Sequence, residues 1–406
     1  MSSIAIVHGS FCGEEIIISK LSESLHLANL TADETVGLAS SISGMTEEKI
    51  RMVFSAKTSV FNKFTHEKER ALSYLRLAVA EKLFEDNHLF IGMPGLLIPR
   101  GISHVLRVCL IANIKARVQK AMHHGGLTEK EAAKRVNQQE IDDVAWIRLA
   151  GETMDPWDPD LYDITIPMDK TDPEEGVELI EKSIWQPAIH PTEVSRRAVQ
   201  DFLLAARVEV ALAREGHVVA VAARGGQVTL TINRQVLMLG RLEDELGSIA
   251  RGVQGVESIQ TKVGKKFHQA DIYRKCDFRM PSKVLLVDDE REFVQTLSER
   301  LQMREVGSAV AYDGQSALEL VDSDEPEVMI LDLKMPGIDG IEVLRRVKST
   351  QPQIEVIILT GHGSEEDRKT CMQLGAFAYI QKPVDIDLLS KTLKEAYDKI
   401  KKEHKG

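Results

Sequence analysis

Short runs of consecutive apolar residues alternate with amphipathic stretches over the last third of the chain. The runs are Val284–Val287, Val328–Leu331, Val356–Leu359 and Tyr379-Ile380. Short, continuously apolar runs are typical of parallel strands that are buried on both faces, and the stretches between them have the periodicity of covering helices. The pattern therefore predicts an α/β fold, here a doubly wound parallel sheet.

Each of these runs is followed by a polar side chain. The acidic pair Asp288-Asp289 follows the first run, Asp332 the second, Thr360 the third and Lys382 the fourth. The ligand crevice of an open parallel sheet lies outside the carboxyl ends of its strands, so we expect these side chains to face one crevice. Three crowded carboxylates repel one another and favour a bound Mg²⁺ ion. A carboxylate beside Mg²⁺ and an ammonium group can attack a phosphoryl donor and hold the resulting aspartyl phosphate.

These residues are part of a longer set of motifs, in which residues 282–404 resemble the receiver domain of two-component response regulators, a flavodoxin-like fold. The motifs are Val-Asp-Asp-Glu at 287–290, Leu-Asp-Leu-Lys-Met-Pro-Gly at 331–337, Leu-Thr-Gly at 359–361, Tyr379 and Lys382-Pro383. The family usually has a cis peptide bond before this proline. The other interpretation of Asp288, Asp289 and Asp332 is that they are ordinary solvated carboxylates at strand ends.

The resemblance implies a role for each of six residues. Asp332 would be the phosphoacceptor, Asp288 and Asp289 would hold Mg²⁺ together with Asp332, Thr360 and Tyr379 would form a switch pair, and Lys382 would contact the phosphoryl group. The implied partner is a sensor histidine kinase or a phosphotransfer protein. The predicted function is that of a phosphorelay response regulator whose receiver controls the modules upstream of it.

A second α/β pattern covers residues 1–186. Ile4–Val7 predicts a strand, Gly9–Gly13 a turn and Glu14–Leu27 a helix. A strand, glycine turn and helix in this order present backbone N–H groups and a helix N-terminus to phosphate. Gly9 and Gly13 are therefore candidate ligands for a nucleotide phosphate, although ordinary turn chemistry explains both glycines equally well.

Two further motifs make residues 1–186 similar to the cytidylate kinase-like branch of the P-loop kinases. They are Gly-Leu-Thr-Glu-Lys-Glu-Ala-Ala at 126–133 and Trp-Asp-Pro-Asp-Leu-Tyr-Asp-Ile at 157–164. The resemblance implies a nucleotide-binding core with a mobile lid over about 125–150.

The charged residues of the first turn and of the lid do not favour phosphoryl transfer. A phosphate-binding P-loop needs Gly-Lys-Ser/Thr, but this chain has Gly13-Glu14-Glu15, and an acid there repels phosphate. The lid reads Gln138–Asp143 and keeps Arg148 as the one arginine of its later part. Lys20, Arg100 and Arg148 are interpreted as solvated charges.

We therefore predict a degenerate, inactive kinase fold that is used for ligand sensing or protein contact. The alternative is an active nucleoside monophosphate kinase that receiver phosphorylation regulates. That alternative requires a lysine or arginine from elsewhere in the fold to reach the phosphates.

Residues 190–264 show the element order helix, strand, strand, helix, strand, with a hairpin signal at Gly225-Gly226. This order, and Gly-Val-Glu-Ser-Ile at 255–259, resemble a BON domain, which we interpret as an interaction module. A small connector without a ligand is the other interpretation. Residues 265–281 form a basic linker; its cations are Lys265, Lys266, Arg274, Lys275 and Arg279.

Composition narrows the choice of function. The chain has 406 residues and a net charge of −11, which argues against broad nucleic-acid binding, and no segment reads as a helix-turn-helix. Its four cysteines include no Cys-x-x-Cys pair. No apolar run reaches the ~18 residues of a membrane span, and the N-terminus lacks the features of a signal peptide. We therefore expect a cytoplasmic protein.

Overall fold

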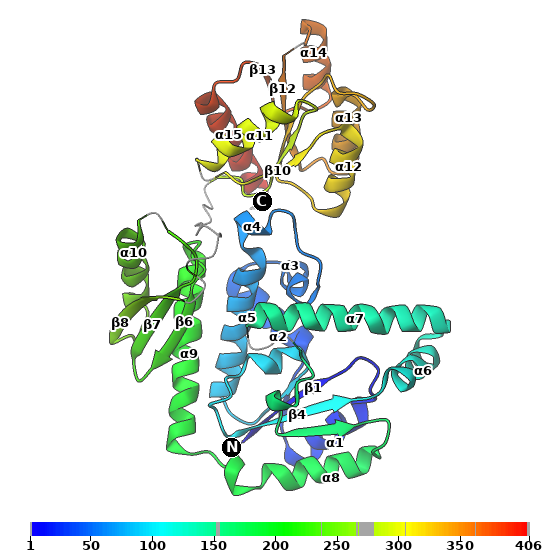
Figure 1. Cartoon of the computed structure of the whole chain (residues 1–406), viewed down its shortest axis with the longest axis vertical. Coiled ribbons are helices and arrows are strands. Elements are labelled where there is room, and N and C mark those ends of the chain that lie inside the picture. Colours follow the sequence, from blue (N-terminus) through cyan, green and yellow to red (C-terminus); the bar gives the residue numbers. More distant parts are fainter. Residues whose placement is uncertain are drawn as a thin grey trace. The chain divides into compact units, whose positions relative to one another are not determined.

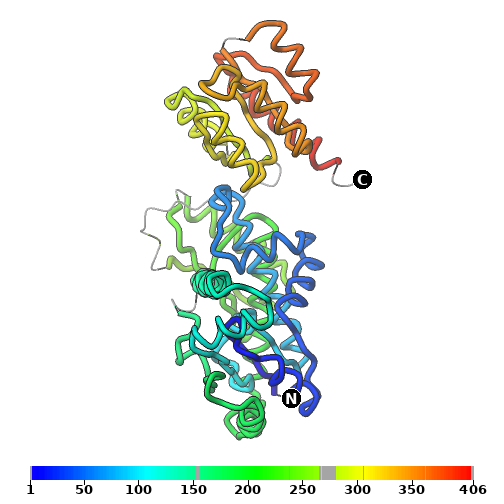
Figure 2. Tube along the Cα trace, turned by 90° about the vertical axis from the view of Figure 1, so that its right-hand side faces the viewer, coloured from blue at the N-terminus to red at the C-terminus, as the bar shows by residue number. Residues whose placement is uncertain are grey.

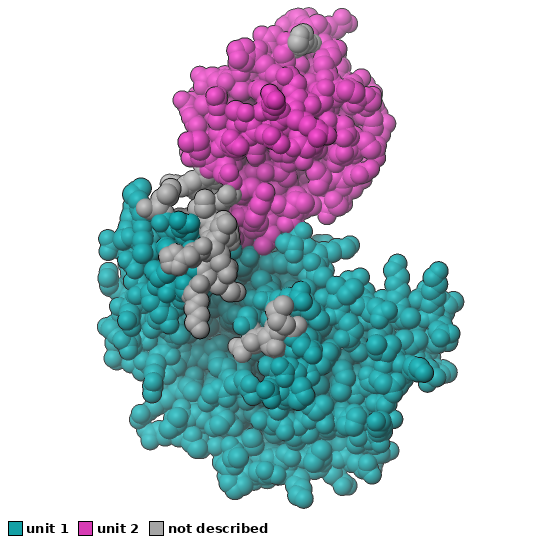
Figure 3. Space-filling model, in the orientation of Figure 1, with its two compact units in different colours: residues 1–58, 67–273 teal, residues 59–66, 274–406 magenta. Residues whose placement is uncertain are grey.

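The computed structural model describes residues 2–151, 155–236, 238–264, 267, 280–304, 306–361 and 363–403. The chain divides into two compact units, residues 1–58 with 67–273 and residues 59–66 with 274–406 (Figure 3). The predicted basic linker at 265–281 lies almost wholly outside the described residues, as do all five of its cations. The domain boundaries expected from the sequence, at 1–186, 190–264, 265–281 and 282–404, remain predictions.

The C-terminal unit contains a five-stranded parallel sheet in the order β10-β9-β11-β12-β13. The strands are β9 (Val284–Val287), β10 (Ser308–Ala311), β11 (Val328–Leu331), β12 (Glu355–Thr360) and β13 (Ala378–Gln381). Four of them are the predicted apolar runs, and β10 is an addition. The strand order reverses between β9 and β11, which is where a doubly wound sheet opens a crevice.

Helices cover both faces of this sheet (Figure 1). They are α11 (Arg291–Gln302), α12 (Gly314–Ser323), α13 (Gly340–Thr350), α14 (Glu365–Gln373) and α15 (Ile386–Glu403). Buried residues of α11 and α15 form one apolar cluster with the sheet, and those of α12 and α13 form a second. The predicted doubly wound α/β fold is confirmed.

The N-terminal unit also contains a five-stranded parallel sheet, in the order β2-β3-β1-β4-β5. Its strands are β1 (Ser3–His8), β2 (Ala28–Leu30), β3 (His88–Ile91), β4 (Val105–Ile111) and β5 (Ile164–Pro167). One face is covered by α1 (Glu15–Leu25) and α8 (Pro173–Ile184). The predicted strand at Ile4–Val7 and the predicted helix at Glu14–Leu27 correspond to β1 and α1.

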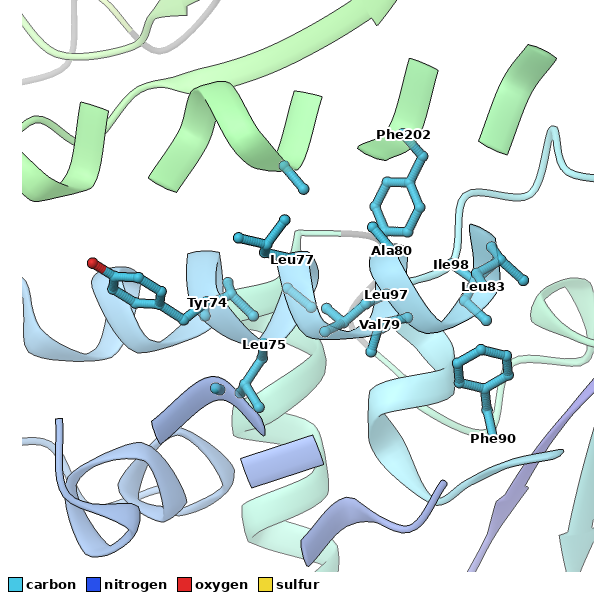
Figure 4. Packing of buried hydrophobic residues seen from close by; sticks show 14 of the residues in the cluster. Tyr74, Leu75, Leu77, Val79, Ala80, Leu83, Phe90, Leu97, Ile98 and Phe202 are labelled. Carbon is cyan, nitrogen blue, oxygen red and sulfur yellow. The ribbon is translucent and has the colours of Figure 1, made fainter. Parts of the chain in front are cut away.

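The other face of this sheet carries the larger core. The helices there are α2 (Ala32–Ser43), α3 (Glu47–Arg51), α5 (Glu67–Phe84) and α9 (Glu193–Arg214), with the short turns η1 (Met52–Phe54) and η2 (Met93–Leu97). Figure 4 shows Leu77 and Ala80 of α5 near Phe202 of α9, with Phe90 of the sheet on another side of α5. Arg76 and Glu209 form an ion pair of 2.6 Å between α5 and α9.

Two helices follow β4, and basic side chains of both reach the first turn of the chain. They are α6 (Ile114–Gly125) and α7 (Glu129–Ala150). Figure 1 shows α7 along its full length, and Figure 2 shows it almost end-on. Trp146 of α7 is fully buried in the core, which fixes the later half of the predicted lid segment.

The middle module has the predicted order of α9, β6 (Ala220–Arg224), β7 (Gln227–Ile232), α10 (Leu239–Arg251) and β8 (Ser258–Val263). Strands β6 and β7 are antiparallel and joined at Gly225-Gly226, where both glycines have positive φ, as a primed hairpin turn requires. Within the described part of the chain, no helix is both long and apolar enough to cross a bilayer.

Candidate functional site

The polar residues predicted to share one crevice lie at the carboxyl end of the C-terminal sheet. Leu331 pairs with Val287 on one side and with Ile358 on the other, so β9 and β11 end at the same level and β12 extends two residues further, to Thr360. Asp288 and Asp332 follow β9 and β11 and are only 4% and 5% exposed. The backbone N–H of Asp332 donates to the carbonyl of Val287 at 2.9 Å, which fixes the two aspartates side by side.

Lys382 reaches across this crevice from the loop after β13. Its Nζ lies 2.7 Å from Asp288 Oδ2, 3.6 Å from Asp332 Oδ1 and 3.2 Å from Glu290 Oε1. Its backbone N–H donates to the carbonyl of Thr360 at 2.9 Å, and the peptide bond between Lys382 and Pro383 is cis, as the resemblance implied. The ammonium group is therefore held beside the predicted phosphoacceptor. Glu290 is a carboxylate of this crevice to which the sequence analysis gave no role.

The two carboxylates are oriented by backbone donors. Asp288 Oδ1 accepts from the N–H of Glu290 at 2.9 Å, and Asp332 Oδ2 accepts from the N–H of Lys334 at 2.8 Å. These bonds leave Asp288 Oδ2 and Asp332 Oδ1 facing the Lys382 ammonium group. Asp332 therefore has one oxygen fixed by the backbone and one directed to the crevice.

Burial and charge act in opposite directions on the ionisable groups of the crevice. Burial raises the pKa of Asp288, and the hydrogen bond from Lys382 offsets only part of this rise. Burial would lower the pKa of Lys382, but the bond to Asp288 and the charge of Asp332 outweigh it and raise that pKa. The surroundings therefore favour the charged form of Lys382, whereas burial disfavours the charged form of Asp288.

The donor set of the crevice fits a hard divalent cation. Asp288, Asp332 and Glu290 place three carboxylates against the ammonium group of Lys382, and Asp289 is the next residue after Asp288. Among the described residues, no three His, Cys, Asp or Glu side chains form a ready-made metal cage. Mg²⁺ is ordinarily held by one or two carboxylates and keeps several waters, so a complete cage is not required.

The predicted switch residues flank the loop after β12. Thr360 is fully buried at the end of β12. The hydroxyl of Tyr379 is buried against Gly363, and no hydrogen-bond partner lies within reach among the described residues. A Cβ atom at Gly363 would lie 1.6 Å from the Tyr379 hydroxyl and 3.0 Å from the Thr360 methyl group. The position of Tyr379 therefore depends on a glycine at 363.

The first turn of the N-terminal unit is held by two cations of α6. Arg117, which is 2% exposed, donates from Nε to the carbonyl of Ser10 at 2.7 Å and from Nη2 to Ser10 Oγ at 2.9 Å. Its Nη1 pairs with Glu140 of α7. Lys120 donates to the carbonyl of Cys12 at 2.5 Å. The turn thus receives the positive charge that its own sequence lacks.

Neither Arg117 nor Lys120 was predicted from the sequence to reach this turn. The three cations named from the sequence lie elsewhere: Lys20 pairs with Glu174, and Arg100 and Arg148 are exposed. The missed signal is a pair of basic residues three positions apart on the helix that follows β4, because residues so spaced share one helix face. Periodicity alone does not tell which turn such a face contacts.

Acidic groups also lie at this turn. Glu14 Oε1 lies 3.1 Å from His8 Nδ1, and Glu140 accepts a bond of 2.7 Å from the indole of Trp157. Gly13 has a φ of +83°, and a Cβ atom at Gly9 would lie 3.0 Å from Cys12 Sγ. Both glycines are therefore required by the turn itself, and their role in phosphate binding stays a prediction.

Asp143 of α7 gives this region a pH dependence. The carboxyl group is 3% exposed, and burial raises its pKa to about 6. Between the ordinary pKa near 4 and this value, the folded chain retains a proton that the unfolded chain has lost, so stability falls as pH rises. We expect the Asp143→Asn variant to be more stable than the native chain at pH 7, with an unfolding free energy larger by on the order of 2 kcal/mol. This difference should become smaller toward pH 4, where the carboxyl group begins to be protonated in the unfolded chain as well.

Urea unfolding followed by tryptophan fluorescence measures this difference, because all three tryptophans lie in the N-terminal unit. The amide oxygen introduced by the substitution can still accept the bond that Gln139 now donates to Asp143 at 2.8 Å. Asp160→Asn, at an exposed position, is the matched control. Equal stability of Asp143→Asn and the native chain at both pH values would contradict the prediction.

Comparison with known proteins finds two families. The model of the response regulator receiver domain matches residues 284–394, and the model of the cytidylate kinase-like family matches residues 3–170. These matches bear out both family resemblances drawn from the sequence. Neither match covers the middle module, so its BON-like interpretation remains a prediction.

Curated proteins that are similar to part of this chain include the following three. Response regulator MprA of Mycolicibacterium vanbaalenii is 36% identical over 110 residues, which are 27% of this chain and 48% of the relative. Transcriptional regulatory protein CpxR of Escherichia coli is 44% identical over 102 residues, 25% of this chain and 43% of the relative. Sporulation initiation phosphotransferase F of Bacillus subtilis is 35% identical over 116 residues, 29% of this chain and 94% of the relative. The chain spans about half the length of the first two relatives and nearly all of the third.

Proposed function

Because the chain belongs to the two-component response regulators through its receiver domain, we propose that Asp332 accepts a phosphoryl group from a sensor histidine kinase or a phosphotransfer protein. The observation that carries this proposal is the buried Asp332 carboxylate at the end of the central strand β11, with Lys382 Nζ 3.6 Å from its free oxygen. Phosphorylation of the full chain by acetyl phosphate with Mg²⁺, read on a phosphate-affinity gel, tests the proposal.

The proposed reaction is a transfer between two side chains. Asp332 Oδ1 attacks the phosphorus of a phosphohistidine on the partner, a P–O bond forms, the P–N bond breaks, and the released imidazole takes up a proton. Lys382 neutralises negative charge on the phosphoryl group, and the Thr360 hydroxyl donates to a phosphoryl oxygen. A Mg²⁺ ion held by Asp288, Asp289 and Asp332 would add Lewis-acid stabilisation of the same charge.

The output of the receiver is proposed to be intramolecular. The kinase-like unit and the BON-like module precede the receiver in sequence and would serve as ligand-sensing or protein-contact modules in a cytoplasmic protein. A change at Thr360 and Tyr379 is the local event that phosphorylation would set off. The support for this step is the packing of both residues around Gly363.

The switch pair makes a specific prediction. In Gly363→Ala, the new methyl group would occupy the place of the Tyr379 hydroxyl, which lies 1.6 Å from an ideal Cβ. The clash involves the far end of a rotatable side chain, so we expect the Tyr379 ring to turn out to solvent while the domain stays folded. Second-derivative absorbance would then show one more exposed tyrosine among the six of the chain.

Gly361→Ala is the matched control for this substitution. A Cβ atom there would meet the Lys382 side chain at 3.8 Å, which is an ordinary contact. The tyrosine spectrum of this control should equal that of the native chain. An unchanged spectrum in Gly363→Ala would show that Tyr379 does not occupy the proposed inward position.

The second candidate function is an active nucleoside monophosphate kinase. Arg117 and Lys120 favour it, because they are cations from elsewhere in the fold that reach the turn after β1. Against it stand Glu14 and Glu140, which already pair with His8 and Arg117. Calorimetric titration of the full chain with ATP and Mg²⁺, then with CMP, separates the candidates; binding followed by turnover would favour the kinase, and no heat would favour the degenerate fold.

A further inference from the structure

One segment of the chain belongs to a different unit from its neighbours in sequence. Residues 59–66 lie between η1 and α5 along the chain, yet they cluster in the same compact unit as the receiver (Figure 3). The segment is a closed turn that contains the short helix α4 (Asn62–Thr65). Ser59 Oγ accepts from the N–H of Phe61 at 3.1 Å, and the carbonyl of Phe61 accepts from the N–H of Thr65 at 3.0 Å. Its shape is therefore set locally.

The segment contributes an aromatic side chain to the receiver core. Phe61 is 1% exposed and belongs to the apolar cluster that contains Leu285 of β9 and Val321 of α12. Large aromatic side chains gain more from burial than most others and are the usual anchors of docked segments. Phe61 is such an anchor.

Two neighbours of Phe61 also contact the receiver, one through a hydrogen bond and one through a close approach to a glycine. The backbone N–H of Val60 donates to Asp324 Oδ2 at 2.7 Å. The other carboxylate oxygen of Asp324 lies 4.0 Å from Lys283 Nζ. A Cβ atom at Gly307 would lie 2.1–2.5 Å from atoms of the Phe64 side chain, so the receiver backbone approaches this ring as only glycine permits.

The contacts all lie at one end of the receiver. Lys283 precedes β9, Gly307 precedes β10, and Asp324 lies between α12 and β11. These are the amino ends of parallel strands, whereas Asp332 follows the carboxyl end of β11. The segment therefore leaves the phosphorylation crevice open.

We propose that the amino end of the receiver sheet is a docking surface whose partner is the segment 59–66 of the same chain, with Phe61 as its anchor. The surface recognises an aromatic side chain through the apolar cluster and a backbone N–H through Asp324. This docking goes beyond the proposed phosphorylation and does not require it.

Hydrogen–deuterium exchange of the full chain without any phosphoryl donor tests the docking. In the native chain, the amides of residues 60–66 are expected to be protected. In Gly307→Ala, the methyl group displaces Phe64, and these amides should exchange about tenfold faster or more. Gly101→Ala is the matched control, because a Cβ atom there meets nothing within 4 Å, and its exchange at 60–66 should equal that of the native chain.

A second variant separates loss of docking from loss of folding. Asp324→Ala removes the acceptor of the Val60 N–H without adding volume, and we expect faster exchange at Val60 while β9, β11 and β12 stay protected. Equal exchange at 60–66 in the native chain and both variants would overturn the proposal. Protection that disappears on dilution would also overturn it, because the partner would then be a second copy of the chain. Phosphorylation of Asp332 is scored separately, so failure of one proposal is distinguishable from failure of the other.

Discussion

Asp332→Asn is expected to abolish phosphoryl uptake by the full chain. An amide nitrogen or oxygen does not attack phosphorus as a carboxylate does, so no aspartyl phosphate can form at this position. The replacement keeps the size of the side chain, and its amide oxygen can still accept the Lys334 N–H bond that now measures 2.8 Å. We expect modification by acetyl phosphate to fall by about a thousandfold or more, below detection on a phosphate-affinity gel.

Asp339→Asn is the matched control for this experiment. Asp339 is exposed, caps α13 and lies seven positions after Asp332, and asparagine caps a helix as well as aspartate does. This control should be modified to the same extent as the native chain. Full modification of Asp332→Asn would show that the phosphoacceptor is another residue and would remove the basis of the proposed function.

The receiver site was predictable because its signals are local. Val284–Val287 and Val328–Leu331 are apolar throughout, and each is followed at once by an aspartate, so strand and site are read from adjacent residues. The edge strand β10 was not predicted because Ser308–Ala311, which is as long as β9 and β11, is only weakly apolar. The contribution of Glu290 and of the Lys334 N–H depends on loop geometry that no periodicity encodes.

The N-terminal unit shows where sequence patterns fail. Ten of the 18 residues of α5 are buried, and they are spread around the helix rather than along one stripe, so the amphipathic pattern of a surface helix is absent. Arg117 contacts Ser10 across 107 positions of sequence, a pairing created only by the fold. The same is true of Val60 and Asp324, which are 264 positions apart.

Arg117→Ala should strongly destabilise the N-terminal unit. The substitution leaves the carbonyl and hydroxyl of Ser10 without their donor and removes the cation that pairs with Glu140. Breaking a buried, hydrogen-bonded ion pair from one side costs several kcal/mol, and partial exposure of Glu140 reduces that cost. We expect a loss of about 3 kcal/mol in unfolding free energy. Denaturant unfolding followed by tryptophan fluorescence measures it without interference from the receiver, which has no tryptophan.

Lys115→Ala on the same helix is the matched control, because Lys115 is exposed and its loss should change stability by less than about 0.5 kcal/mol. Similar stability of the two variants would contradict the prediction that Arg117 stabilises the turn.

The same measurement with ATP present addresses the second candidate function, since a ligand that binds only the folded state stabilises it in proportion to the logarithm of its concentration. Nucleotide that stabilised the native chain but not Arg117→Ala would mean that the guanidinium group exchanges its Ser10 bonds for phosphate, and the turn would then be a binding site. If nucleotide changes the unfolding free energy of neither chain, the role of Arg117 is to stabilise the turn. The receiver aspartate is then the site of phosphate chemistry that the described residues support.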